Sequence, residues 1–256
     1  MSMYRIIVVI VAVVFNFSVG WVIAHAEENN PFTATLTSRV WSKYVVSAGL
    51  NLHNKPVLQT DLYVQHSSGL YCDIWWSVGL DGTSPNSDFG DEIDYTCGWT
   101  GKAGGLVLNF GVAYFDVHRL FGRPADDVVQ IFGEVNHTFP VGVHSVTPFL
   151  RFEYSMVPPG SASDLKPTIE AHVGATFAIN LNEKIALAIR PAFMYNSGGL
   201  VGDPISLFHP AVSFQVKLSG KVTLEVINLK FPVPLTHTSD DRKFAFVGGI
   251  GIVVTF

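Results

Sequence analysis

Two pairs of side chains have residue types that could do chemistry: His209 with Ser213, and Cys72 with Cys97. A serine and a histidine act as nucleophile and base only when they are in hydrogen-bond contact. His209 and Ser213 lie four residues apart on one face of a predicted strand, which separates them by roughly 13 Å at the rise of a β-strand. We therefore predict no catalytic residues in this chain.

The other histidines and the glycine-rich stretches also lack the spacing of a binding site. The chain has nine histidines, but no two of them have the spacing of a metal-binding HExxH motif. Gly101–Gly105 does not have the spacing of a phosphate-binding loop. We therefore expect no metal site, no cofactor and no enzyme activity.

The two cysteines are placed to meet across a hairpin. A hairpin centred between Ser84 and Pro85 puts Cys72 and Cys97 directly opposite each other on neighbouring strands. Opposed residues lie about 4.5–5.5 Å apart, which is within the range that a disulfide spans. An exported protein meets an oxidising compartment, so we predict a disulfide here. The alternative is two unpaired small apolar side chains.

A larger set of charged and polar side chains recurs at alternate positions of the predicted strands. In a closed barrel this set would face inward, where it would either set the field of a channel or pair into a side-chain plug. The sequence leaves both alternatives open and slightly favours a narrow pore. The candidate pore-lining residues are Lys43, Asp61, Asp73, Glu134, Arg151, Glu153, Glu170, His172, Arg190, His209, Lys217 and Glu225.

The composition predicts export without a transmembrane helix. Residues 1–26 have the pattern of a cleaved signal peptide: Arg5, an apolar run over 6–15, and Ala24-His25-Ala26 at the cleavage site. An uncleaved anchor is the alternative, but the run is short for one. Charged residues are only 14% of the chain, against about 25% in a typical soluble domain. The net charge of −5 and the lack of a basic tract make nucleic acid an unexpected partner.

Period-two alternation of apolar and polar residues dominates the rest of the chain, and its connections alternate between short and long. This pattern predicts an all-β fold, a transmembrane up-and-down antiparallel β-barrel of about 12 strands. A soluble sandwich or lipocalin would carry more Lys and Asp on its polar face. The predicted strands are 39–50, 57–66, 69–80, 92–101, 105–115, 127–138, 145–156, 167–179, 184–196, 206–218, 221–229 and 243–256.

The carboxyl end reads as the strand that closes this barrel. It lacks charged residues after Lys243 and ends on an aromatic residue, Phe256. Its outward residues are the expected signal read by the barrel assembly machinery: Phe246, Ile250, Ile252, Val254 and Phe256.

Four stretches resemble a known family. They are Ser42-Lys43-Tyr44-Val45-Val46, Lys55-Pro56-Val57-Leu58-Gln59, residues 69–77 (GLYCDIWWS) and residues 91–101 (DEIDYTCGWTG). They are similar to the motifs of the TorF-type porins, also described as the Gcw_chp family of conserved hypothetical outer-membrane proteins, and the likeness covers roughly residues 40–135. Val46-Ser47-Ala48-Gly49 and the two cysteines depart from the family pattern. The resemblance implies an outer-membrane barrel with a channel role, and it implies no substrate and no catalytic residues.

These observations combine into one expected organisation. Residues 1–26 are a signal peptide, 27–38 a short periplasmic segment and 39–256 a barrel in the bacterial outer membrane. The expected partners are outer-membrane lipid, the assembly machinery and small solutes that pass through a narrow lumen. The alternatives are a barrel that conducts nothing and serves a structural or partner-binding role, and an enzyme acting on lipid, which would need a polar cluster on the outward face.

Overall fold

A computed structural model describes residues 30–81, 92–116, 127–157, 166–200, 203–237 and 244–256. Within these residues no helix is long and apolar enough to cross a membrane. The strands are β1 (Phe32–Trp41), β2 (Tyr44–Val45), β3 (Asn51–His53), β4 (Val57–His66), β5 (Leu70–Gly79), β6 (Glu92–Ala103), β7 (Leu106–Asp116), β8 (Val128–Asn136), β9 (Phe139–Val141), β10 (His144–Met156), β11 (Thr168–Asn180), β12 (Ile185–Arg190), β13 (Ala192–Asn196), β14 (Ile205–Phe208), β15 (Ala211–Lys217), β16 (Val222–Lys230), β17 (Val233–Pro234) and β18 (Val247–Thr255).

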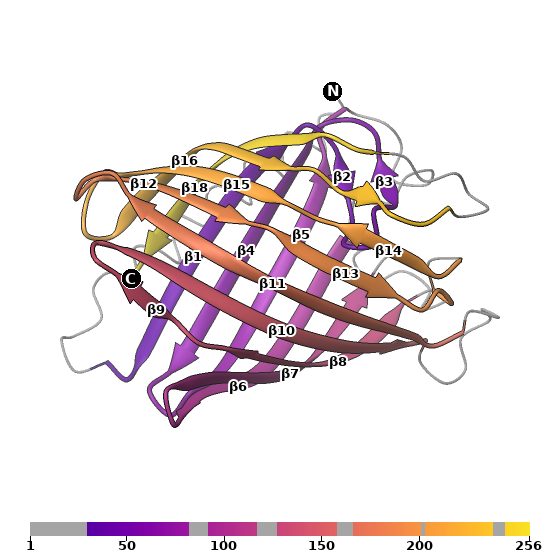
Figure 1. Cartoon of the computed structure of the whole chain (residues 1–256), viewed down its shortest axis with the longest axis horizontal. Coiled ribbons are helices and arrows are strands. Elements are labelled where there is room, and N and C mark those ends of the chain that lie inside the picture. The colour runs from indigo at the N-terminus through magenta and orange to yellow at the C-terminus, as the bar shows by residue number, and fades with distance from the viewer. Residues whose placement is uncertain (1–29, 82–91, 117–126, 158–165, 201–202, 238–243) are drawn as a thin grey trace.

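The strands form a closed antiparallel barrel with 12 strand positions around its wall, which confirms the predicted fold class (Figure 1). Four of these 12 positions are interrupted and consist of two pieces: β8 with β9, β12 with β13, β14 with β15, and β16 with β17. The barrel closes where β1 pairs with β18, from Thr35 opposite Thr255 to Trp41 opposite Gly249. The short turns lie at one end together with the start of β1 and the end of β18, and the longer connections lie at the other. We call these the turn end and the loop end.

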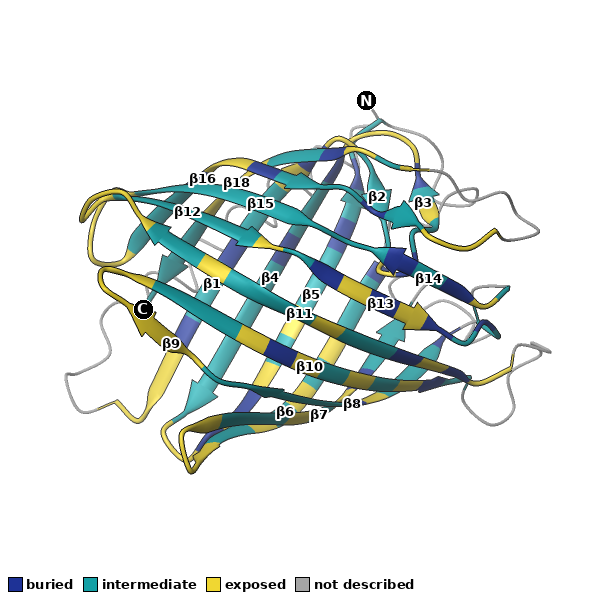
Figure 2. Cartoon of the chain, in the orientation of Figure 1, coloured by how far each residue is buried: buried dark blue, intermediate teal, exposed yellow. Residues whose placement is uncertain are grey.

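Alternation along each strand separates an outward apolar surface from an inward polar one. The outward side chains are large and exposed, as with Ile250 at 61%, Leu70 at 59% and Val173 at 54%. Exposed residues recur along β5, β6, β7, β10 and β11 (Figure 2). A soluble protein rarely exposes so large a continuous apolar surface, so this band is suited to contact with lipid.

The first strand is the main correction to the sequence prediction. It runs over Phe32–Trp41 rather than 39–50, so the barrel begins before residue 39 and most of 27–38 is not a periplasmic segment. The predicted signal peptide lies outside the described residues. Residues 42–56 instead form a long connection at the loop end that contains the small hairpin β2–β3, with Gly49 at a φ of 75° in its turn. This connection, which we call the first loop, therefore resembles the other long loops in length.

Four inward aromatic rings lie flat against glycines of the neighbouring strand. Each ring is the direct cross-strand partner of its glycine: Tyr71 of Gly98, Phe132 of Gly111, Phe149 of Gly174, and Trp41 of Gly249. A Cβ atom at any of these glycines would come within 3.0 Å of the ring. The absence of a glycine side chain thus lets a bulky ring lie along the wall instead of projecting into the lumen.

Candidate functional site

The inward surface is the candidate site, and its two ends differ in character. Toward the turn end the inward side chains of β11, β12 and β15 are small, and none of Thr176, Ala178, Ala186, Ala188 and Ser213 is buried. In a packed interior such residues would be almost fully buried. The buried apolar clusters of the described residues lie instead at the loop end, where the first loop meets the wall. The lumen is therefore open toward the turn end and narrowed toward the loop end.

A network of ion pairs lines the wall formed by β8, β10 and β11. Arg151 Nε donates to Glu153 Oε1, and Arg151 Nη1 lies 3.6 Å from Glu134 Oε2. Gln130 on β8 donates to Glu153 at 3.1 Å. These partners come from adjacent strands, so the network runs along the wall.

The same network continues to β13 through His172 and Glu170. His172 Nε2 lies 3.2 Å from Glu170 Oε2 and 3.8 Å from Glu153 Oε2, and Asn196 donates to Glu170 Oε1 at 2.6 Å. Ligand-type atoms of Glu153, Glu170 and His172 lie within 4.8 Å of one another, a spacing that could hold a cation. Each carboxylate already accepts hydrogen bonds from Arg, amide or hydroxyl donors, however, so hydrogen bonding within the protein accounts for the cluster.

A second ion pair joins the first strand of the barrel to a strand near its carboxyl terminus. Arg39 on β1 reaches across Gly251 of β18 and holds Glu225 of β16 with two hydrogen bonds, at 2.5 Å and 3.0 Å. Asn228 donates to Glu225 at 2.9 Å, and the Glu225 side chain is only 5% exposed. The sequence prediction included Glu225 but missed Arg39, because the predicted strand began at residue 39. The alternating run Thr33, Thr35, Thr37, Arg39 is the signal that could have found it.

Three cations lie on the flat aromatic rings. Arg151 lies 4.3 Å from the centroid of Phe132, Arg190 lies 4.3 Å from that of Phe149, and Lys230 Nζ lies 4.4 Å from that of Trp41. The rings attract these cations through their electron-rich faces, and Arg151 is also paired with Glu153 and Glu134. Among the described residues, neither Arg190 nor Lys230 has an acidic group within 4.0 Å. Lys230 was missed because it follows the end of the predicted strand 221–229.

Acidic side chains gather on β4, β5 and β6. Asp61, Asp73 and Asp94 have an inward carboxylate oxygen that is buried and lacks a hydrogen-bond partner within the described part of the chain. Asp73 interacts electrostatically with both Asp61 and Asp94. Asp61 and Asp73 are predicted pore residues. Asp94 was missed, although it shares the inward parity of its strand.

The first loop crosses the lumen at the loop end. Tyr44 donates to Glu92 of β6 at 2.6 Å and its ring lies 5.8 Å from that of Trp75 of β5. On the other side, Ser47 donates to Glu170 of β11 at 3.1 Å. Burial, followed by the charge of Glu92, raises the pKa of the Tyr44 phenol well above its usual value, so Tyr44 remains a neutral donor. The loop thus connects two walls that are separated by several strands.

Apolar contacts fix the tip of the same loop. Ala48 is buried against Met194 of β13 and against Ile205 and Leu207 of β14. This is why the predicted strand 39–50 was wrong: its apolar residues alternate like those of a strand, but they pack inside the barrel. It also corrects the placement of Lys43, which lies in the first loop and not on a spanning strand.

The remaining predicted residues lie at the margins of this arrangement. Lys217 is exposed at the turn end of β15. His209 lies between β14 and β15, close enough to Arg190 and Lys230 to interact with them electrostatically. Ser213 accepts a hydrogen bond from Gln215 at 3.4 Å. His209 and Ser213 make no contact with each other in the part of the chain that the structure describes.

The two cysteines are opposed as predicted, since Cys72 pairs with Cys97 in the register of β5 and β6. Both side chains are exposed on the outward face, and both thiols are free in this structure. The predicted register is therefore confirmed, and the disulfide stays a prediction.

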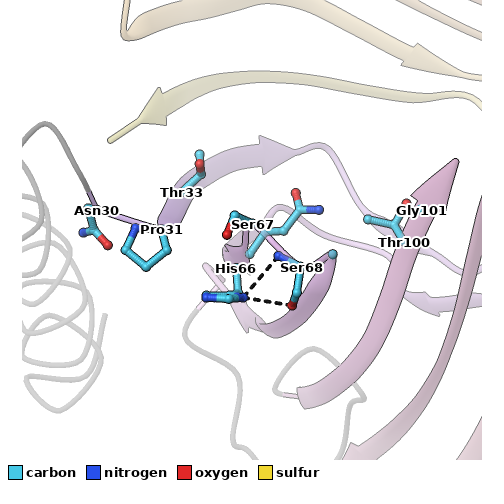
Figure 3. A pocket seen from close by; sticks show the side chains of 10 residues that line it. Asn30, Pro31, Thr33, His66, Ser67, Ser68, Thr100 and Gly101 are labelled. Carbon is cyan, nitrogen blue, oxygen red and sulfur yellow. Dashed lines mark hydrogen bonds between the residues drawn. The ribbon is translucent and has the colours of Figure 1, made fainter.

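A separate cavity of about 460 Å³ opens at the turn end (Figure 3). It lies between the start of β1, the turn that follows β4 and the last residues of β6. His66 Nδ1 contacts the Ser68 hydroxyl at 2.8 Å within it. Its lining has no Asp, Glu, Lys or Arg, so it is distinct from the charged surface of the lumen.

Comparisons with solved structures place the fold among outer-membrane barrels. The NanC porin aligns with a TM-score of 0.56 at 9% identity, over 86% of this chain and 98% of that one. The COG4313 outer membrane channel from Pseudomonas putida F1 aligns with a TM-score of 0.54 at 11% identity, over 90% and 97%. The KdgM porin aligns with a TM-score of 0.54 at 7% identity, over 87% and 99%. At such identities the likeness establishes the fold.

No curated protein sequence matches this chain. A family model described as "Bacterial protein of unknown function (Gcw_chp)" matches residues 25–157, which is 133 of 256 residues and so just over half of the sequence. This match covers the first loop, the acidic strands and the Glu134–Arg151–Glu153 network. The chain therefore belongs to the Gcw_chp family of bacterial proteins.

Proposed function

We propose that this protein is an outer-membrane channel for the passive passage of small solutes, with its constriction formed by the first loop. The observation that carries the proposal is the contrast within the lumen. Small, partly exposed side chains of β11, β12 and β15 line the turn end, while the loop end is narrowed by the hydrogen-bonded first loop. The family match and the porins among the structural neighbours support the same function.

The non-conducting alternative needs a lumen filled by paired side chains. The described inward ion pairs of Arg151 and Arg39 lie within one strand, join neighbouring strands, or join strands separated by one glycine-bearing strand. The bulky rings lie against the wall for the same reason, because glycines leave room for them there. This arrangement favours a channel over a plugged barrel, even though 12 strands give a lumen of intermediate width.

The proposal includes the environment and the assembly route. The outward apolar band would contact lipid, with the long loops outside the cell and the turns in the periplasm. Ile250 and Ile252 are exposed on the outer face of β18, and Phe246 is exposed just before that strand. With Val254 and Phe256 they would form the signal read by the assembly machinery. We assign the chain no catalytic role and no cofactor.

Liposome swelling tests this function. Purified protein in liposomes should admit neutral sugars, with a swelling rate that falls steeply from three-carbon to six-carbon solutes because the constriction is narrow. Heat-denatured protein added to the same liposomes is the control. A swelling rate for the smallest solute equal to that of the control would overturn the proposal.

A further inference from the structure

We infer that the constriction selects small zwitterionic solutes, molecules that carry an ammonium group at one end and a carboxylate at the other. The inference rests on the proposed channel function and names its substrate class. It is based on two inward walls of opposite chemical character, one made of basic and one of acidic side chains. We call them the basic wall (Arg190, His209 and Lys230) and the acidic wall (Asp61, Asp73 and Asp94).

The basic wall has a defined construction. Arg190, Ala211 and Lys230 lie on one line of the cross-strand register, with the small Ala211 between the two cations. His209 lies two residues before Ala211. Each of the two cations is held on an aromatic ring, so its position is fixed, and no ion pair with a carboxylate is formed by either cation within the described residues. Such a site lacks an anion, and a solute carboxylate would supply one.

The acidic wall has carboxyl groups that lack a nearby cation. Its three carboxyl groups each have an unpartnered buried oxygen, and no described Lys or Arg lies within 4.0 Å of them. Ser77, on the same face of β5, is 2% exposed and its hydroxyl also lacks a partner. An ammonium group offers three N–H donors, which suits several oxygens that lack donors.

The two walls lie on nearly opposite sides of the barrel. Around the 12 strands, β5 at the centre of the acidic wall is five strands from β15 in one direction and seven in the other. β12 and β15 lie on the near side of the barrel in Figure 1, and β4 and β5 on the far side. The acidic groups that interact electrostatically with Arg190 and Lys230 are Glu134 and Glu225, and neither of them belongs to the acidic wall. Two cations therefore face a cluster of carboxyl groups across the lumen, which gives the lumen a transverse field.

This field acts differently on different solutes. A zwitterion can direct its carboxylate to the basic wall and its ammonium group to the acidic wall, and so gains on both sides. A neutral solute of the same size gains neither interaction. A simple anion or cation is attracted by one wall and repelled by the other, so ion selectivity of the whole pore should be weak.

The test compares fluxes of a zwitterionic ω-amino acid and a neutral polyol of equal size into the same proteoliposomes. The wild-type flux ratio should favour the zwitterion by about fivefold. It should fall toward one both in Arg190→Gln/Lys230→Gln and in Asp61→Asn/Asp73→Asn. The reversal potential in a salt gradient should move toward cation selectivity in the first variant and toward anion selectivity in the second. Lys184→Gln, in an exposed turn, is the matched control for loss of a charge.

The outcomes separate the inference from the channel function. A wild-type ratio near one, with clear flux of the neutral polyol, overturns zwitterion selection and leaves the channel intact. Absence of flux for both solutes overturns the channel itself. If only one of the double variants lowers the ratio, the selection belongs to a single charged wall, and the two-wall account is wrong.

Discussion

Replacing the first loop by a two-residue turn is expected to raise the single-channel conductance at least about twofold, since the constriction of a pore governs its conductance. Trp41 and Val57 are direct cross-strand partners, so Asn-Gly can join β1 to β4 as a tight hairpin. The replacement removes Tyr44, Ser47 and Ala48, which together hold the loop against both walls. The measurement is single-channel conductance in planar bilayers.

A second variant should also widen the constriction, without shortening the chain. Ala48→Glu puts a charge into the buried contact with Met194 and Leu207, so the loop tip should leave the wall. Its conductance should also rise, with more current noise than the hairpin variant because the released loop still occupies the mouth. Asn54→Ser, at an exposed position of the same loop, is the control. Unchanged conductance in both loop variants would show that the loop is not the constriction.

Removing Arg39 is expected to destabilise the barrel by about 3 kcal/mol, because it leaves a buried carboxylate without its cation. Glu225 would retain only Asn228 as a donor, at a position 5% exposed to solvent. The pair also links β1 to β16 across the closing strand β18. Loss of the pair should therefore weaken the seam of the barrel, the place where β1 meets β18. The urea midpoint of unfolding in detergent micelles measures this effect for Arg39→Ala.

The double variant Arg39→Leu/Glu225→Leu should recover most of the lost stability, since it removes both charges together. Arg39→Lys should be intermediate, because an ammonium group cannot reproduce the two parallel hydrogen bonds. An unfolding midpoint of Arg39→Ala equal to that of the wild type would show that the pair does not hold the seam.

The sequence predicted the architecture well because a barrel repeats one local rule. Strands such as Leu70–Gly79 and Leu106–Asp116 lie within a residue or two of their predicted bounds. The opposition of Cys72 and Cys97 followed from hairpin arithmetic alone. The error at 39–50 has a definite cause: alternation shows that one set of side chains is buried, but not whether lipid or another part of the lumen covers it.

The candidate site was predictable as a set of inward residues but not as pairs. Glu134, Arg151 and Glu153 were expected inside the barrel and are there in contact. Arg39 meets Glu225 only because the first and last strands close the barrel, so a local pattern could not reveal the pair. Lys230 and Asp94 complete the charged walls. Lys230 was missed because the predicted strand ended one residue before it. Asp94 was left out although its strand was correctly placed.

The most direct test of the central claim is conductance of the purified wild-type protein in planar bilayers. The account predicts discrete, uniform conductance steps that vary linearly with salt concentration and show weak ion selectivity, as expected for a water-filled lumen with opposed charges at its constriction. Membranes that contain the folded, inserted barrel and stay silent across a wide range of voltages and salt concentrations would contradict it.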